Sequence, residues 1–186
     1  MSSESKLRGG ANIPSLSAFD REGNLTVIIE TPKGSRNKYA YDEKHRVFML
    51  KKVLPEGMVF PHDFGFVPST LAEDGDPLDV LVLMDYQAFP GCVVLARVIG
   101  VIEGQQQEEK QKVRNDRLIA VACPSHTHSD LRHINDLNNS FLKQLETFFE
   151  SYHQATGSRY KTLNYKGPKR ALQLVNKSIK AKEQQT

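Results

Sequence analysis

The apolar residues of this chain change their spacing once, and that change limits the folds available to it. Up to Ala122 they gather in short runs rich in β-branched residues, separated by glycine, proline, asparagine and aspartate. After Pro124 they recur in steps of three and four. Runs of the first kind are typical of strands, and the second spacing is typical of amphipathic helices. Strands followed by helices predict an α+β fold.

Five strands are expected in the first part of the chain. They span Leu25 to Thr31, Val47 to Leu54, Leu78 to Met84, Val93 to Glu103 and Leu118 to Ala122. Their uneven spacing favours a small barrel or a strongly bent sheet. The polar stretch from Gly104 to Asn115 lies between the last two, and it is expected to form a mobile hairpin or loop.

Two helices are expected in the second part. The first carries the apolar residues from Leu137 to Tyr152, with Asp136 as its N-cap and Gly157 as its stop. The second begins at Pro168, a favourable residue in a first helical turn, and carries apolar residues from Ala171 to Ile179 on one face.

The length and composition suit one domain in a reducing compartment. A chain of 186 residues with 39% hydrophobic content can bury one core, so residues 1–186 are expected to form a single domain, with 1–20 and 181–186 as flexible ends. Cys92 and Cys123 lie in or beside apolar stretches and are interpreted as buried thiols. No N-terminal apolar segment is present, so a cytoplasmic location is expected.

Charge and hydropathy argue against two kinds of partner. The formal net charge is +3, from 25 basic and 22 acidic residues, which is too small to indicate a nucleic acid. No apolar run approaches the roughly 20 residues that a membrane span requires, so no membrane partner is expected.

Three aspartates, Asp74, Asp76 and Asp79, lie within six residues just before an apolar strand. Gly75 allows a tight turn between them, and Pro77 fixes the backbone after it. Converging carboxylates repel one another unless a hard divalent cation offsets their charge, although a solvated acidic turn is an equal alternative from these residues alone. The spacing excludes an EF-hand, and magnesium held by a few carboxylates, water and substrate phosphates fits better.

A basic turn precedes this cluster. Glu30 ends the first strand, and Lys33, Arg36 and Lys38 follow around Gly34. Cations beside a metal can neutralise charge that develops on phosphoryl oxygens. Read alone, however, such a turn is more often a solvated loop.

Taken together, these segments resemble the soluble family I inorganic pyrophosphatases. The resemblance rests on Ile29-Glu30-Thr31-Pro32 with Lys38-Tyr39, on Phe60 to Phe66, and on Asp74-Gly75-Asp76-Pro77-Leu78-Asp79. The last segment matches the family signature D-[SGDN]-D-[PE]-[LIVMF]-D. The resemblance implies a distorted five-stranded OB-like β-barrel with two flanking α-helices. It also implies Mg²⁺-dependent hydrolysis of diphosphate to two orthophosphates, with Mn²⁺ or another divalent cation as a substitute, and a homo-oligomer.

The resemblance also implies roles for individual residues. Asp74 and Asp79 would be metal ligands, and Asp76 would hold the attacking water between metals and accept its proton. Glu30 would serve a further metal ion through water. The remaining implied residues bind substrate phosphates: Lys38, Lys52 and Tyr152, with lysine at position 52 where the family more usually has arginine.

Several positions depart from the family pattern. Ala40 stands where glutamate is usual, and Phe64 where a phosphate-binding tyrosine is usual. Asn115 replaces a metal-binding aspartate, while Arg117 and His153 each replace a lysine. One hypothesis is a working enzyme in which Asp116, Glu108 or Glu109 supplies a metal ligand and Arg117 stabilises the leaving phosphate. The alternative is a catalytically weakened homologue that binds metal and a phosphate compound.

Two other kinds of site have weaker support in the sequence. His126, His128 and His133 lie in a polar connector without a zinc-binding spacing, so zinc is not expected. Phe60, Phe64 and Phe66 could stack bases on an OB-like surface, but phenylalanines around Pro61 and Gly65 more often line an interior.

Overall fold

Five strands close into a ring in the computed structural model, which describes residues 13, 16–108 and 111–185. Their order around the ring is β1 (Leu25–Thr31), β4 (Asp63–Phe66), β5 (Asp79–Leu83), β8 (Arg117–Ala122) and β6 (Val93–Glu108), and β6 pairs with β1 again. Only β5 and β8 run parallel; the other neighbours are antiparallel. The ring confirms the α+β, OB-like arrangement that the resemblance implies.

Strand β6 extends beyond the ring and organises one side of it. Its first half pairs with β1 and β8, and its end pairs with β7 (Gln111–Arg114) and β9 (Arg159–Lys166). Its pairing register shifts after Val98 and after Glu103, and such irregularities bend a strand. The stretch from Gly104 to Asn115, expected as a hairpin or loop, is therefore a hairpin formed by the end of β6 and by β7. Glu109 lies outside the described residues.

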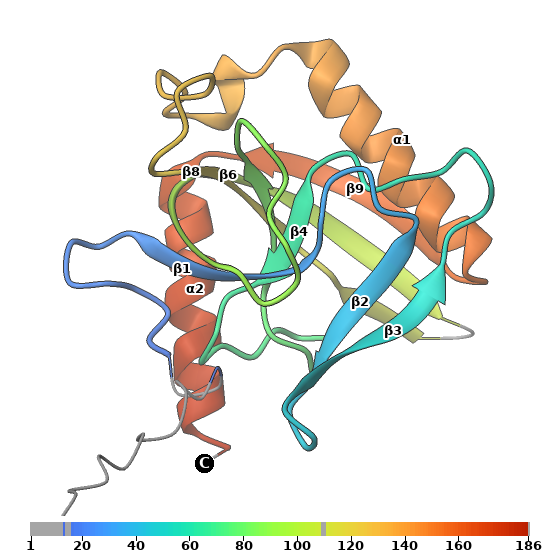
Figure 1. The fold of residues 1–186 in the computed structure, drawn as a ribbon, viewed down its shortest axis with the longest axis horizontal. Coiled ribbons are helices and arrows are strands. Elements are labelled where there is room, and N and C mark those ends of the chain that lie inside the picture. The colour runs from blue at the N-terminus through green and yellow to red at the C-terminus, as the bar shows by residue number, and fades with distance from the viewer. Residues whose placement is uncertain (1–12, 14–15, 109–110, 186) are drawn as a thin grey trace, which may run out of the picture.

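A separate two-stranded hairpin projects from the ring (Figure 1). It consists of β2 (Asn37–Asp42) and β3 (Val47–Val53), and it pairs Lys38 with Lys52. This register sets two cations side by side.

Alternate strand residues face two apolar clusters, as the twofold repeat of a strand requires. On β5, Val80 and Val82 pack with α2 (Pro168–Glu183), whereas Leu81 and Leu83 belong to the cluster that includes α1 (Asn139–Ala155). Figure 1 shows the two helices on different sides, with α1 beside β9. Phe60, Phe64 and Phe66 are buried, as expected for phenylalanines that line an interior.

Some element boundaries differ from the expected ones. Asn138, not Asp136, caps α1, because its side chain accepts a hydrogen bond from the Phe141 N–H at 2.7 Å. Asp136 instead ends a short 3-10 turn and accepts from the His133 N–H. The second helix begins at Pro168 as expected, and it runs to Glu183, so residues 181–183 belong to its last turn.

The structure also bears on the expectations about the cysteines and about membrane spans. Cys123 is exposed and Cys92 is only partly buried, so their interpretation as buried thiols was wrong for Cys123. Within the described residues, no helix has the length and apolar character to cross a membrane.

Candidate active site

A cleft of about 1170 Å³ opens where the ring, the β2–β3 hairpin and the end of α1 meet. Every residue that lines it except Val113 has a polar group in its side chain: Lys38, Lys52, Asp74, Asp76, Asp79, Gln106, Gln111, Val113, Asn115, Arg117, Tyr152, His153, Thr156 and Ser158. Seven of the residues proposed from the sequence are in this set, whereas Glu30 and Asp116 are not.

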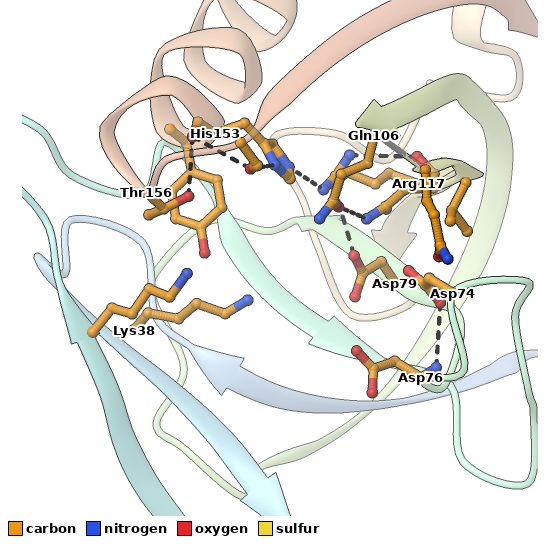
Figure 2. Close-up of a pocket in the computed structure, with 14 residues that line it drawn as sticks. Lys38, Asp74, Asp76, Asp79, Gln106, Arg117, His153 and Thr156 are labelled. Carbon is orange, nitrogen blue, oxygen red and sulfur yellow. Dashed lines mark hydrogen bonds and ion pairs between the residues drawn. The ribbon is translucent and has the colours of Figure 1, made fainter. Parts of the chain in front are cut away.

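One wall of the cleft is acidic. Asp74 and Asp76 lie in the loop before β5, and Asp79 is the first residue of that strand. The Asp76 N–H donates to the Asp74 carboxylate at 3.2 Å, and Gly75 between them has a φ of 91°, a conformation that glycine adopts without strain. The turn therefore directs three carboxylates into one cleft (Figure 2).

Burial and mutual repulsion disfavour the charged form of the carboxylates in the acidic wall. Burial, followed by the charge of Asp79, raises the pKa of Asp74 to about 6. Burial also raises the pKa of Asp79, against the opposing effect of Arg117 and Lys38. Carboxylates in this situation are stabilised in their charged form by a nearby cation.

Glu30 lies next to this wall without lining the cleft. Its carboxylate accepts a hydrogen bond from the Tyr41 N–H at 2.7 Å. Burial raises its pKa to about 7, although the Tyr41 hydrogen bond and Lys38 oppose the rise. The charges of Asp79 and Asp76 add to the rise, as expected for a carboxylate near the acidic wall.

The opposite side of the cleft is basic. Lys38 from β2 points towards Tyr152 from α1, with its Nζ 5.6 Å from the centre of the tyrosine ring and 5.6 Å from the centre of the Phe64 ring. Burial lowers the pKa of Lys38, but Tyr152, Asp79 and Glu30 outweigh it, so the pKa lies above its ordinary value. Lys38 is therefore a charged ammonium facing the carboxylates (Figure 2).

Arg117 lies beside the acidic wall. It is the first residue of β8, and its Nε lies 3.7 Å from the Asp79 carboxylate. Its Nη2 lies 3.0 Å from His153 Nε2. The guanidinium also contacts the rings of Phe149 and Tyr160, at 4.3 and 4.5 Å from their centres.

The structure separates Asp116 from the other candidate ligands. Its carboxylate forms an ion pair with Arg114 at 2.8 Å and accepts the Gly104 N–H at 2.9 Å. The neighbouring Asn115 does line the cleft, and its amide donates to Gln106 at 2.7 Å. The wall formed by β6, β7 and the start of β8 thus presents amides where the acidic wall presents carboxylates.

Sequence reasoning missed the polar groups at the end of α1. His153 was noted only as a departure, and Thr156 and Ser158 not at all, yet all three line the cleft. His153 and Ser158 lie five residues apart across the helix end, and their side chains are 2.9 Å apart. Spacing across an irregular turn carries no periodic signal, so only the structure shows this contact.

The donor set suits a hard divalent cation. Oxygen ligands from carboxylates are the kind that magnesium binds, and the mutual repulsion of Asp74 and Asp79 would be relieved by such an ion. Within residues 13, 16–108 and 111–185, no three acidic, histidine or cysteine side chains stand close enough together to hold an ion between them. Asp74, Asp76 and Asp79 nevertheless share one cleft and offer the expected chemistry.

Comparison with known proteins points to one family. The family model described as "Inorganic pyrophosphatase" matches residues 27–183. An inorganic pyrophosphatase of Synechocystis sp. is 37% identical over 163 residues, which cover 88% of this chain and 94% of the relative. One from Geobacillus stearothermophilus is 37% identical over 155 residues, 83% and 92% of the two chains.

Solved structures agree with these relatives. The crystal structure of inorganic pyrophosphatase from Thermus thermophilus superposes with a TM-score of 0.84 at 34% identity, over 93% of this chain and 99% of that chain. The inorganic pyrophosphatase of Helicobacter pylori gives 0.82 at 32% identity, over 91% and 99%.

Proposed function

This chain belongs to the inorganic pyrophosphatase family, and from that premise we propose that its cleft hydrolyses diphosphate to two orthophosphates. The observation that carries the proposal is that acidic and basic side chains lie on opposite sides of one cleft. Three carboxylates face Lys38 and Lys52 across a space large enough for a diphosphate and its water, and Arg117 lies beside Asp79. Such an arrangement binds cations and phosphate oxygens at once.

Asp74, Asp76 and Asp79 would hold the divalent cations, and Glu30 would hold a further ion through water. A cation bound there would lower the pKa of water and offset phosphate charge. Asp76 would orient the attacking water and accept its proton. No hydrogen bond from another side chain engages the Asp76 carboxylate among the described residues, which leaves it available for this role.

The basic side would hold the substrate. Lys38 and Lys52 are adjacent in the hairpin register, and Tyr152 lies beside Lys38, so these groups can contact neighbouring phosphate oxygens. Arg117 would stabilise the leaving phosphate. Fixed cations aimed at developing negative charge are a main source of rate in phosphoryl transfer.

The test is phosphate release from diphosphate by the purified protein. Release is expected with Mg²⁺, is expected to stop when a chelator is added, and is expected to return when excess Mg²⁺ is restored. Folded protein that releases no phosphate above background with Mg²⁺, Mn²⁺ or Co²⁺ would contradict the proposal.

The geometry of Asn115 and Asp116 supports a second candidate, a weakened homologue that binds metal and a phosphate compound. The Asn115 amide is neutral, and the Asp116 carboxylate is engaged by Arg114. Calorimetric titration with diphosphate and Mg²⁺ separates the two candidates. Binding without any released phosphate would favour the second.

Three finer properties belong to the same proposal. Magnesium is the proposed ion because the donors are carboxylate oxygens. Two unpaired thiols, Cys92 and Cys123, support a reducing compartment such as the cytoplasm. Exposed apolar side chains support a homo-oligomer of single-domain chains; they include Val47, Met49, Leu50 and Val53 on β3 and Tyr86 and Phe89 in the loop after β5.

A further inference from the structure

The orientation of the Arg117 guanidinium is set by more than packing. The residue is only 3% exposed, and the rings of Phe149 and Tyr160 lie against the guanidinium. Ring contacts favour a position for the flat group, but they do not select which N–H groups face the cleft. Hydrogen bonds make that selection, because their strength depends steeply on angle.

His153 provides the decisive hydrogen bond. Arg117 Nη2 lies 3.0 Å from His153 Nε2. A guanidinium has donors and no acceptor, so Nε2 must be the acceptor and must carry no proton. The imidazole is therefore a neutral ring with its proton on Nδ1.

Ser158 holds the ring in this tautomer. Its hydroxyl lies 2.9 Å from His153 Nδ1 and donates to the main-chain carbonyl of His153 at 3.3 Å. Because its one proton is directed to that carbonyl, the hydroxyl oxygen can accept the Nδ1–H. The hydrogen bonds therefore run in one direction: Arg117 donates to His153 Nε2, His153 Nδ1–H donates to the Ser158 hydroxyl, and that hydroxyl donates to the main-chain carbonyl of His153.

The surroundings keep the imidazole neutral and immobile. His153 is 4% exposed, stacks on Tyr160 with ring centres 5.1 Å apart, and meets Tyr152 edge-on at 5.2 Å. Burial, then the charges of Arg117, Lys38 and Lys52, lowers the pKa of His153 to about 3.

The Nε edge of Arg117 faces the acidic wall. Its Nε is buried, makes no hydrogen bond in the described part of the chain, and pairs with the Asp79 carboxylate at 3.7 Å. Nη1 donates to the main-chain carbonyl of Asn115 at 3.4 Å, so this bond and the bond to His153 together fix how the guanidinium is turned.

We propose that His153 is a positioning residue: fixed as the Nδ1–H tautomer by Ser158, it turns Arg117 so that the Nε edge faces Asp79 and the guanidinium charge is held at the cleft. This inference rests on the proposed function, because it assigns that charge to the stabilisation of bound diphosphate. In this pair the neutral His153 ring accepts a hydrogen bond from the charged Arg117 guanidinium, whereas a protonated His153 would place two cations side by side.

The tautomer can be tested without any activity. Long-range ¹H–¹⁵N correlation spectra at pH 7.5, assigned by comparison with His153→Gln, are expected to show His153 with its proton on Nδ1. In Ser158→Ala this preference is expected to weaken. A wild-type His153 that is protonated on Nε2, or on both nitrogens, would overturn the proposal.

Kinetics test the positioning role. His153→Leu, which has no acceptor, is expected to lower kcat/KM about tenfold or more, as for the loss of one hydrogen bond to a charged group. His153→Gln, whose amide oxygen can replace Nε2, is expected to restore most of it. Gln154→Ala, at the exposed next position of α1, is the matched control and is expected to leave kcat/KM unchanged.

A double-mutant cycle separates positioning from simple support of the fold. In the Arg117→Ala background, His153→Leu is expected to cause no further loss, because the residue that it positions is gone. The same loss in both backgrounds would overturn the proposal. Should the wild type release no phosphate, the proposed function fails by itself, and titration with imidodiphosphate decides the positioning role: affinity equal in wild type and His153→Leu would refute it.

Discussion

At the scale of single residues, the acidic turn illustrates how far a local pattern reaches. Asp74, Asp76 and Asp79 were identified as a group because they are neighbours in sequence, and the structure places all three in one cleft. Asp116 is different, because its pairing with Arg114 and the Gly104 N–H depends on how β6 passes β8. Contacts of that kind depend on strand register, which the sequence around Asp116 does not reveal.

Replacing Asp76 with asparagine tests its role as the proton acceptor. Asp76→Asn keeps the shape of the side chain and removes the base, so kcat is expected to fall by about 10²–10⁴-fold. Phosphate release under saturating Mg²⁺ measures the effect, and the unfolding midpoint in urea serves as the check on folding. A folded variant with wild-type turnover would show that Asp76 is not the base.

Asn115→Asp tests whether the amide wall limits cation binding. The new carboxylate would face the cleft beside Gln106, where Asn115 now donates a hydrogen bond at 2.7 Å. Loss of that bond is expected to cost about 1 kcal/mol of unfolding free energy without metal, while Mn²⁺ binds more tightly than to wild type. Calorimetry with Mn²⁺ measures the affinity, and Gln111→Glu, also in the cleft lining, asks whether any added carboxylate has this effect. Unchanged Mn²⁺ affinity in Asn115→Asp would contradict the prediction.

At the scale of elements, the sequence predicted strands that carry runs of apolar residues, whether buried like β1 or exposed like β3, and missed strands that are polar or very short. β1 is rich in β-branched residues and buried along nearly its whole length. β2 is partly exposed throughout and β9 mostly exposed, with polar residues at most positions, so neither shows a two-residue apolar repeat. β4 has only four residues, too few for any repeat to be recognised. These missed elements are held by pairing with neighbours, which is a property of the assembled sheet.

Gly65 marks a place where two elements approach too closely for a side chain. A Cβ atom at this position of β4 would lie 2.0 Å from the Ile28 carbonyl oxygen of β1. Gly65→Ala is therefore expected to destabilise the protein by about 3 kcal/mol or more, since backbone cannot move aside cheaply. Urea unfolding measures the change. Gly57→Ala is the comparison, because Gly57 has a φ of 81° and no atom near the added carbon, and about 1–2 kcal/mol is expected there. Equal losses at the two positions would contradict the steric account.

At the scale of the whole molecule, half-buried His62 and buried His153 link stability to pH. Burial, followed by the charges of Lys33 and His128, lowers the pKa of His62 from 6.5 to about 4. The unfolded chain therefore takes up a proton at higher pH than the folded one. The stabilisation is fully present above about pH 6.5 and is lost as the pH falls towards about 4. His153 acts in the same direction.

His62→Gln is expected to make the protein less sensitive to acid. Between pH 7.5 and 5 the wild type is expected to lose about 1–2 kcal/mol more unfolding free energy than the variant. Urea unfolding at the two pH values gives the difference. His126→Gln, at an exposed position, accounts for the removal of a histidine as such. Identical pH dependence in wild type and His62→Gln would show that His62 is not held neutral in the folded state.

The negative charge of the acidic wall is expected to make the stability of the whole fold depend on bound cations. Burial and mutual repulsion raise the pKa of Asp74 to about 6, so folding brings the carboxylates into an environment that opposes their charge. A divalent cation that binds only the folded chain adds stability as RT ln(1 + [L]/Kd), about 2.7 kcal/mol at 100 times Kd. Mg²⁺ is therefore expected to raise the unfolding midpoint in urea, and Asp79→Asn is expected to lose most of that gain. Glu56→Gln, which removes an exposed carboxylate paired with Arg36, controls for nonspecific salt effects. If Mg²⁺ stabilised Asp79→Asn and wild type equally, the cation would be acting elsewhere on the surface.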